Sequence, residues 1–411
     1  MRKQKLYEKL ARLAVRRGVN VQPGQPLVIR ADVRDHLFIE MCVKEAYEAG
    51  AGSVSVDWRS QPVTKMDYTY QTEETLADIG HWVYDREKGR HEAGACYLSV
   101  VSDMPGALKD IDASKIHAYQ KAYYGLMADL QKYTMNNEGQ WSVIGVPSMD
   151  WAKAVFPDLP EEEAFEKLED AIFAVTRVSE DNDPAADWQA HDDDLISHAE
   201  KLNAYAFKEL HFTSELGTDL HVGLVKNHIW VGGGCTTPAG VYFDPNMPTE
   251  EIFCMPEKTK VSGTVYASKP LSYNGILIDG FHLVFKDGKV ISHGAEKEEE
   301  ALGALLDFDE GSRYLGEVAL VPYDSPVSQS GILFLNTLYD ENAACHLALG
   351  RPYPENLQGG TEMSEEELEA HGANSSSQHH DFMFGTAEMN IDGICEDGTA
   401  VPVFRHGNFV F

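Results

Sequence analysis

The sequence predicts the α/β fold class, with an N-terminal α/β domain around a mostly parallel sheet and a C-terminal α+β domain. Three observations support this prediction. Segments with strand and helix periodicity alternate through the first half, strand segments joined by hairpin turns fill the second half, and an acidic, proline-containing stretch separates the two. With 411 residues, the chain is too long for one ordinary core and suits two domains.

Hydrophobic periodicity locates the elements of the first half. Leu6, Leu10 and Leu13 recur at helical spacing and Gly18 stands where helices commonly end, so residues 4–17 should form a helix. The same criteria predict further helices at 36–49, 107–132 and 160–177, and strands at 26–29, around 54–56, at 96–101 and at 141–146. Strands that alternate with helices favour a parallel sheet covered on its faces.

The stretch SEDNDPAADWQAHDDD, residues 179–194, is polar, acidic and interrupted by a proline. We place the domain boundary there, which gives an N-terminal domain at 1–190 and a C-terminal domain at 191–411. In the second domain, residues 216–219 and 286–289 are typical hairpin turns, and residues 332–338 are an apolar run that predicts a strand.

Composition excludes several classes of partner. The chain has 66 acidic and 34 basic residues and a formal net charge of -32, which argues against nucleic acid and against membrane surfaces. The acidity is compatible with cationic substrates, metal ions or simply solubility. The N-terminus lacks a secretory signal and no window suits a bilayer span, so a cytoplasmic location is expected. The six cysteines show no CxxC spacing and should be free, mostly buried thiols.

Residue types that ligate metals concentrate in the second domain. Glu250 and Glu251 follow Pro-Thr, which suits either an ordinary helix start or a metal ligand. Glu317 interrupts an apolar strand at 315–321. A carboxylate there is costly on a buried face unless it is paired or binds a metal, and costs nothing on a solvent face.

His346 lies among small and apolar residues and should be buried, either as a hydrogen-bonded core histidine or as a ligand. Its closeness to Asp340 and Glu341 favours the functional interpretation. Tyr353 stands between two prolines, which suits a positioned hydroxyl and equally a packed loop. The glutamates at 365–367 follow Ser364 as a capping box and are expected to be structural.

The segment from Gln378 to Gly385 should be extended. Side chains alternate along a strand, so His379 and Asp381 share a face while His380 points away. Imidazole and carboxylates without thiolates suit zinc, cobalt or manganese in a hydrolytic site. HExxH, GxSxG and GxxxxGK[ST] motifs are absent from the sequence, which argues against three common hydrolase and phosphate-binding designs.

The segments NMPTEEIF, GEVALVPYDSPVSQSGILFLNTLYDENAACHLALG and HHDFMFG resemble the metalloaminopeptidase family of aminopeptidases T and S. The opening LARLAVRRGVNVQPGQPLVIRADV is similar to the same family, so the resemblance covers most of the chain. It implies two divalent metal ions, peptide substrates with a free N-terminus and a homodimer. The implied metal ligands are Glu251, Glu317, His346, His379 and Asp381, with Tyr353 and Glu317 as catalytic residues.

Under this resemblance, Tyr353 would donate a hydrogen bond to the tetrahedral oxyanion, and Glu317 would relay a proton to the leaving amine. Only the resemblance selects Glu251 over Glu250, whereas strand geometry and resemblance agree on His379. One alternative is a dinuclear metallophosphoesterase, disfavoured because no arginine cluster lies near these residues in the sequence. A second is a noncatalytic metal-binding relative, which the full set of residue types disfavours.

Overall fold

The computed structural model describes residues 3–273 and 276–411, and the chain forms two compact units. Unit 1 contains Met1–Gln189 and Gly234–Pro248, and unit 2 contains Ala190–Gly233 and Thr249–Phe411. The segment Gly234–Pro248 thus returns to unit 1 from within the second half of the sequence. The two expected kinds of architecture are confirmed, because unit 1 holds a parallel sheet and unit 2 holds antiparallel sheets.

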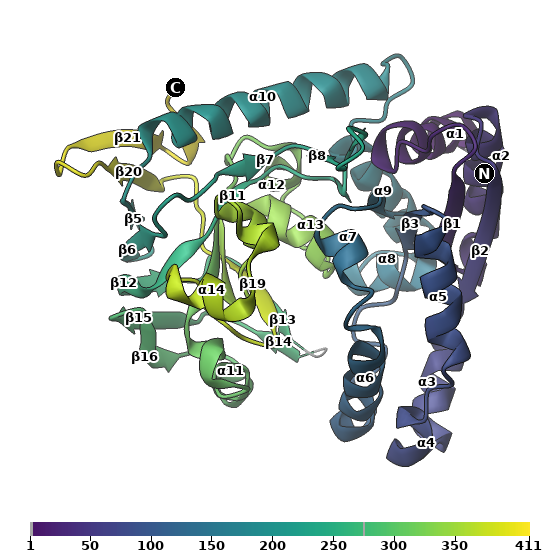
Figure 1. The fold of residues 1–411 in the computed structure, drawn as a ribbon, viewed down its shortest axis with the longest axis horizontal. Helices are drawn as coiled ribbons and strands as arrows, with labels where there is room; N and C mark the ends of the chain where they lie inside the picture. The colour runs from purple at the N-terminus through teal and green to yellow at the C-terminus, as the bar shows by residue number, and fades with distance from the viewer. Residues whose placement is uncertain (1–2, 274–275) are drawn as a thin grey trace. The chain divides into compact units, whose positions relative to one another are not determined.

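Unit 1 is built on a five-stranded sheet with the order β10-β4-β3-β1-β2. Its strands are β1 (Pro26–Asp32), β2 (Ser53–Arg59), β3 (Cys96–Val101), β4 (Trp141–Gly145) and β10 (Asn246–Met247). Figure 1 labels three of these strands, β1, β2 and β3. All four neighbouring pairs are parallel. The returning segment supplies the edge strand β10 and the small pair β8 (Cys235–Thr236) and β9 (Tyr242–Phe243).

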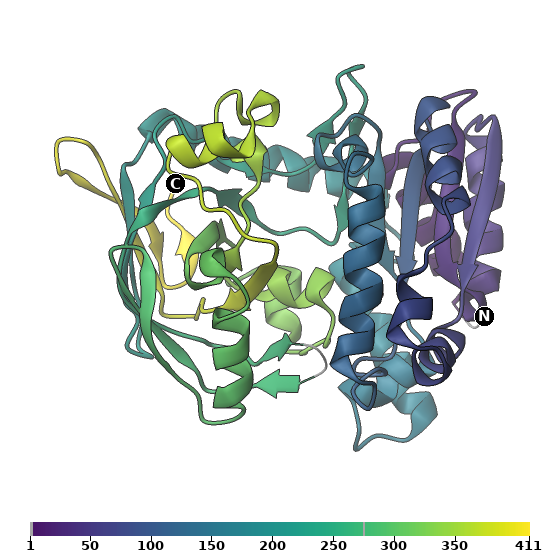
Figure 2. The ribbon, with the colours of Figure 1, turned by 60° about the horizontal axis from the view of Figure 1, so that its bottom comes forward.

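Helices of unit 1 cover this sheet (Figure 2). They are α1 (Gln4–Leu13), α2 (His36–Glu48), α3 (Gln61–Tyr70), α4 (Glu73–Ala77), α5 (Trp82–Glu92), α6 (Ala113–Met127), α7 (Lys132–Met135), α8 (Met149–Val155) and α9 (Glu161–Val175). Successive side chains of β1 point to opposite faces. Ile29 therefore packs in one cluster with Leu10 of α1 and Phe38 of α2, while Val28 packs with Tyr97 in another.

Two predicted helices differ from the observed ones at their ends. The first continues from α1 into a π-helical turn, Ala14–Gly18. The predicted helix at 107–132 is instead α6 followed by α7. Asp112 sets the later start, because its side chain accepts a hydrogen bond from the Ser114 backbone N–H and so caps α6.

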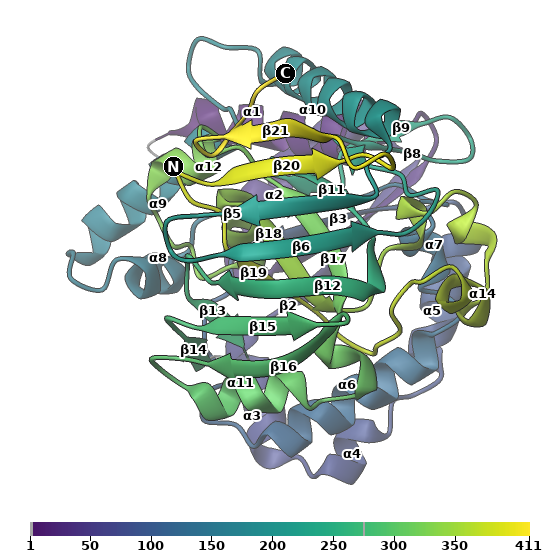
Figure 3. The ribbon, with the colours of Figure 1, turned by 90° about the vertical axis from the view of Figure 1, so that its left-hand side faces the viewer.

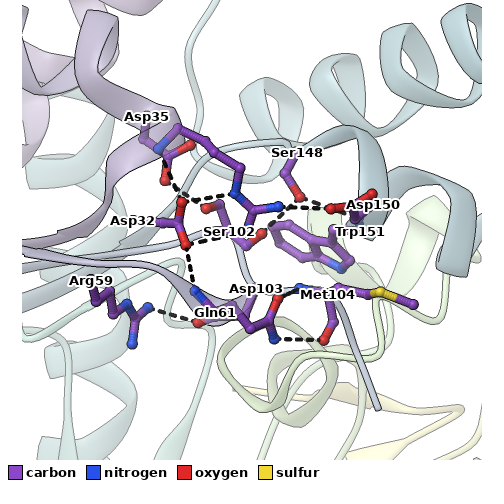
Figure 4. Close-up of polar contacts among 11 residues, drawn as sticks. Asp32, Asp35, Arg59, Gln61, Ser102, Asp103, Met104, Ser148, Asp150 and Trp151 are labelled. Atoms are coloured by element: carbon purple, nitrogen blue, oxygen red, sulfur yellow. Dashed lines mark hydrogen bonds and ion pairs between the residues drawn. The ribbon is translucent and has the colours of Figure 1, made fainter. Parts of the chain in front are cut away.

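A polar network occupies the carboxyl ends of the parallel strands (Figure 4). Asp32, the last residue of β1, accepts hydrogen bonds from the Arg34 side chain and the Gln61 backbone N–H. Ser102, just after β3, donates its hydroxyl to Asp35. Burial, with the nearby charge of Asp32, raises the pKa of Asp35 to about 6 despite that hydrogen bond. Asp35 is thus a partly buried carboxyl that resists ionisation.

The acidic stretch at 179–194 is mostly helical, contrary to its polar, turn-like composition. Helix α10 (Pro184–Tyr205) begins inside it. Trp188, Leu195 and Leu202 are buried and spaced by seven residues, so they fall on one helix face among the acidic side chains. Pro184 is compatible with the helix because it stands in the first turn, where its missing N–H has no partner to lose.

The larger sheet of unit 2 has eight strands in the order β16-β15-β12-β6-β5-β20-β21-β22 (Figure 3). They are β5 (Glu209–Thr213), β6 (Asp219–Leu224), β12 (Pro256–Tyr266), β15 (His282–Lys286), β16 (Lys289–Gly294), β20 (Asn390–Ile394), β21 (Ala400–Arg405) and β22 (Asn408–Phe409). Both predicted hairpin turns are confirmed. Asp287 and Gly288 have positive φ angles of 50° and 82°, as the tight turn between β15 and β16 requires.

The second sheet of unit 2 has five strands in the order β19-β18-β17-β11-β7. They are β7 (Val231–Gly232), β11 (Ile252–Cys254), β17 (Leu315–Leu320), β18 (His346–Gly350) and β19 (His379–Met383), and every neighbouring pair is antiparallel. A small pair, β13 (Leu271–Tyr273) and β14 (Ile276–Ile278), accompanies the sheets. The remaining helices are α11 (Glu299–Leu306), α12 (Pro326–Ser330), α13 (Thr337–Asp340) and α14 (Glu365–Ala370).

The strand predicted at 332–338 is wrong, because this apolar run forms a loop that leads into α13. Leu335 has a φ of 57°, which no strand permits. The Asp340 carboxylate accepts hydrogen bonds from the backbone N–H groups of Phe334 and Asn336, at 2.7 and 3.0 Å. These donors are therefore taken by a side chain rather than by a neighbouring strand.

Two further expectations concern the membrane and the cysteines. Among the helices formed by the described residues, none combines the length and apolarity needed to cross a bilayer. All six cysteines are free, and all but Cys235 and Cys395 are buried, as predicted.

Candidate metal centre

Three strands of the five-stranded sheet carry most of the predicted ligands. Glu317 lies on β17, His346 begins β18, and His379 and Asp381 lie on β19. In the strand register, Ala348 lies opposite both Glu317 and Asp381. Because side chains in such a row share one face, only the methyl group of Ala348 stands between the two carboxylates.

The opposite face of these strands belongs to the main hydrophobic core of unit 2. Its members on β17, β18 and β19 are Leu315, Val318, Leu320, Leu347, Leu349 and Phe382. A slip of one residue in register would bring every one of these apolar side chains to the polar face, so core packing fixes which residues face the site.

The ligand atoms converge closely. His346 Nε2 lies 3.0 Å from Glu251 Oε2 and 3.4 Å from Glu317 Oε1. His379 Nε2 lies 3.2 Å from Asp381 Oδ1 and 3.8 Å from Glu317 Oε2. Two trios, Glu251–Glu317–His346 and Glu317–His379–Asp381, each present one ligand atom per residue within 4.8 Å of the others. Glu317 belongs to both trios, with one oxygen facing each histidine.

Both histidines are oriented by backbone carbonyls. His346 Nδ1 lies 3.2 Å from the carbonyl oxygen of Ala344, and His379 Nδ1 lies 2.6 Å from that of Arg351. A carbonyl can only accept a hydrogen bond, so Nδ1 must carry the proton in each ring. In a neutral imidazole this leaves the Nε2 lone pair facing the carboxylates, as in many metal-binding histidines.

Two carboxylate oxygens without hydrogen-bond partners indicate that the cluster suits a cation. Glu251 Oε2 and Asp381 Oδ1 are buried and accept no hydrogen bond from the residues the structure describes. Their close contacts are with imidazole nitrogens, Glu251 Oε2 at 3.0 Å from His346 Nε2 and Asp381 Oδ1 at 3.2 Å from His379 Nε2. Buried carboxylate oxygens are costly without a partner. This donor set, two imidazoles and three carboxylates, fits a divalent metal ion.

Burial makes the charges of the cluster strongly interdependent. Burial raises the pKa of Glu317 to about 6, although His346 and His379 act to lower it. Burial also opposes ionisation of Asp381, yet His379 lowers its pKa to about 2. Burial lowers the pKa of His379, but Asp381 and Glu317 outweigh that effect and raise it to about 10. Without a cation, protons on the imidazoles balance the carboxylates, so metal binding here must release protons.

Glu341 is a further carboxylate near the cluster, which the sequence analysis did not place among the ligands. It opens a 3-10 turn, Glu341–Ala343, directly after α13. Burial raises its pKa well above the usual range, and the nearby charges of Glu251 and Asp381 raise it further. The available signal was its place in the acidic pair five residues before His346. Its neighbour Asp340 instead holds the loop described above.

Tyr353, between β18 and α14, packs its ring against both a hydrophobic side chain and a ligand. Its centroid lies 5.7 Å from that of Phe253 and 4.9 Å from that of His379. The residue is 39% exposed, but burial of its hydroxyl and the charges of Glu317 and Asp381 raise its pKa well above the usual range. The ring is therefore packed on these two side chains, and the charges of the carboxylate cluster act on its hydroxyl.

The structure distinguishes Glu250 from its neighbour Glu251, and His380 from its neighbour His379. Glu250 is buried, its backbone N–H donates to Asn342, and its carboxylate lies 3.5 Å from His191 Nε2 rather than in either trio. His380 packs edge-on against Tyr273, with centroids 5.1 Å apart. The glutamates at 365–367 open α14, where Ser364 and Glu367 form the predicted capping box.

A model of the thermophilic metalloprotease family (M29) matches residues 3–409. The chain belongs to this family. Aminopeptidase AmpS of Bacillus subtilis is 47% identical to it over 406 residues, which are 98% of this chain and 97% of that protein. Aminopeptidase 2 of Geobacillus stearothermophilus is 45% identical, covering 99% of this chain and 98% of that protein. The structure of wild-type AmpT from Thermus thermophilus matches with a TM-score of 0.93 at 39% identity, covering 99% and 100% of the two chains.

The predicted resemblance and fold class are thereby confirmed, and the chain is a metalloaminopeptidase, a hydrolase of peptide bonds. Membership of a metalloprotease family implies divalent metal ions, and the aminopeptidase relatives imply peptide substrates. The structure brings Glu251, Glu317, His346, His379 and Asp381 of this metalloaminopeptidase into one cluster.

Proposed function

We propose that this metalloaminopeptidase removes single amino acids from the free N-terminus of peptides with two divalent cations, held by Glu251, Glu317, His346, His379 and Asp381. The observation that supports two cations is the position of Glu317. It is the one residue common to the two trios of potential ligand atoms, and its two oxygens face different histidines.

The proposal assigns one cation to each trio. Glu251 and His346 hold the first with Glu317, and His379 and Asp381 hold the second with Glu317. Glu341 is a further candidate ligand, because its carboxylate is influenced by the charges of the same cluster. Zinc, cobalt and manganese suit imidazole and carboxylate donors without thiolates. When bound, the cations supply Lewis acidity toward water and the scissile carbonyl.

The side chains supply the remaining chemistry. Glu317 is the proposed carboxylate for proton transfer to the leaving amine, since it is central to the cluster. Tyr353 is proposed to donate its hydroxyl to the oxyanion that develops on the carbonyl, and packing on Phe253 and His379 holds its ring in place.

A substrate panel tests the exopeptidase assignment. Metal-reconstituted enzyme is assayed with leucine p-nitroanilide, N-acetyl-leucine p-nitroanilide and p-nitrophenyl phosphate. The proposal expects hydrolysis of the first alone, because the acetyl group removes the terminal ammonium that an aminopeptidase must recognise. Cleavage of the acetylated substrate contradicts the requirement for a free N-terminus. Efficient hydrolysis of the phosphate ester favours the metallophosphoesterase alternative.

Two further properties expected from the sequence are also part of the proposal. These are a homodimer in solution and a cytoplasmic location. Sedimentation equilibrium tests the first, with a mass of two chains expected and a single-chain mass at micromolar concentration contradicting it. Subcellular fractionation tests the second.

A further inference from the structure

A second group of imidazoles and carboxylates lies on the solvent-facing side of the eight-stranded sheet of unit 2. Glu209 and His211 come from β5, and Asp219 and His221 come from β6. Side chains of β5 alternate between buried and partly exposed, with Leu210 in the core. All four polar residues therefore project from the side of the hairpin that faces solvent. Figure 3 shows β5 and β6 as neighbours in this sheet.

The two histidines face each other directly across the strands. His211 pairs with His221 in the register, and their rings are stacked with centroids 4.0 Å apart and planes 7° from parallel. Each ring contacts a carboxylate on the other strand, one diagonal step away. His211 Nε2 lies 2.7 Å from Asp219 Oδ1, and His221 Nδ1 lies 2.8 Å from Glu209 Oε1.

The neighbouring strands leave these carboxylates available to a cation. On β20, Asp392 lies opposite His211, and its carboxylate is paired with the guanidinium of Arg405. On β12, the uncharged Ser262 lies opposite His221. The guanidinium of Arg405 is thus already matched by a carboxylate, and Lys260 of β12, which lies against Gly223, is paired with Glu257.

The outer contacts are hydrogen bonds of 2.7 and 2.8 Å, whereas the corresponding contacts at the candidate metal centre are longer. There, imidazole nitrogens lie 3.0 to 3.8 Å from the carboxylate oxygens that would share a cation with them. On the outer face, one ligand atom each from His211, Asp219 and His221 lies within 4.8 Å of the other two. The outer group differs in exposure: the side chains of His211 and Asp219 are 28% and 73% exposed, so an ion can enter directly from solvent.

We propose that His211, Asp219 and His221 bind a third divalent cation of the zinc or copper type, with Glu209 as a fourth donor. Two imidazoles select such ions over calcium and magnesium, which prefer oxygen ligands alone. The cross-strand pair supplies two nitrogen donors whose backbones the sheet already fixes, so little order is lost on binding. The ion bridges β5 and β6 and stabilises the hairpin that they form.

Zinc content per chain tests this proposal. Wild-type protein and the variant His211→Ala/His221→Ala are equilibrated with micromolar zinc, dialysed and compared by elemental analysis. The variant is expected to retain one ion fewer per chain, whatever number the catalytic centre holds, and to keep its aminopeptidase activity. His406→Ala is the matched control, because His406 lies in the turn between β21 and β22, outside the strand register, and its Nδ1 contacts the Glu388 carboxylate at 2.8 Å. It should lose no zinc.

A second variant tests the proposal independently in case the first does not fold. Asp219→Asn alters only a largely exposed carboxylate, so the sheet should fold normally while zinc binding weakens by about 10-fold or more. Zinc should also raise the melting temperature of wild-type protein more than that of Asp219→Asn. Equal zinc content and equal zinc-induced melting shifts in wild type and both variants would overturn the proposal.

Discussion

Glu317 Oε1 lies 3.4 Å from His346 Nε2, across the adjacent antiparallel strands β17 and β18. The other oxygen of Glu317 faces His379 on β19. A single buried carboxylate thus joins two groups of potential ligands, and the proposed two-metal centre depends on it more than on any other residue.

Replacing Glu317 should therefore remove both cations at once. Glu317→Gln keeps the size of the side chain but replaces the charged oxygens that both trios share. We expect loss of both metal ions, and a fall in kcat that exceeds the 10- to 100-fold typical of residues that only support ligands. Glu250→Gln is the matched control, because Glu250 is buried nearby but lies outside both trios. If elemental analysis finds that Glu317→Gln still binds one metal ion per chain with undiminished affinity, Glu317 is not a ligand shared by both ions.

The neighbours His379 and His380 should respond in opposite ways to truncation. His379 Nε2 lies 3.2 Å from Asp381 Oδ1, whereas His380 points to the other side of β19 and packs against Tyr273. His379→Ala should lose metal and activity, and His380→Ala should keep most of both. Equal losses of metal in the two variants would mean that β19 does not present alternate residues to the centre.

Tyr353→Phe separates a chemical role of the hydroxyl from packing of the ring. The ring contacts with Phe253 and His379 are retained in this variant, so folding, metal content and KM should change little. Loss of one oxyanion donor typically lowers kcat by about 10² to 10³. A normal kcat in the metal-loaded variant would remove the hydroxyl from the mechanism and leave the metal centre intact.

Asp35 in unit 1 gives a prediction about stability and pH. Its pKa is raised from 3.8 to about 6 in the folded protein, chiefly by burial, so the folded state binds more protons than the unfolded state between those values. Wild-type stability should therefore fall as pH rises through this window and stay lower above it. Asp35→Asn keeps an acceptor for Ser102 but carries no charge, so it should escape this loss.

The expected difference between Asp35→Asn and wild type is about 1 to 2 kcal/mol above pH 7, allowing for partial exposure, and close to zero below pH 4. Thermal melting from pH 3 to 8 measures it. A melting difference for Asp35→Asn that is constant across this range would contradict the assignment.

Three of the proposed ligand residues stand out locally in the sequence, whereas only the family resemblance selects Glu251 over Glu250. Glu317 interrupts an apolar strand, and His379 and Asp381 alternate in an extended segment. Glu341 could not be selected in the same way. Nothing in the sequence distinguishes it from Asp340, although the charges of the cluster raise the pKa of Glu341 whereas the Asp340 carboxylate holds the loop before α13.

Other differences arise from tertiary structure that local patterns do not contain. The apolar run at 332–338 has the composition of a strand, but the backbone N–H groups of Phe334 and Asn336 bond to Asp340 instead of a neighbouring strand. The return of Gly234–Pro248 to unit 1 depends on pairing of β10 with β4, more than a hundred residues earlier in the chain. In α10, acidic residues are interspersed with the buried residues such as Trp188, so the helical spacing of the apolar residues is hard to recognise in the sequence.

The most direct test of the account is a metal titration of the metal-free enzyme, followed by hydrolysis of leucine p-nitroanilide. The variant His211→Ala/His221→Ala is used, so that the proposed ion on the outer face does not enter the count. The two-metal proposal predicts that the metal-free enzyme is inactive and that the rate of hydrolysis rises with added cobalt or zinc until two ions are bound per chain. Full activity in the metal-free protein, or a maximum at one ion per chain, would contradict it.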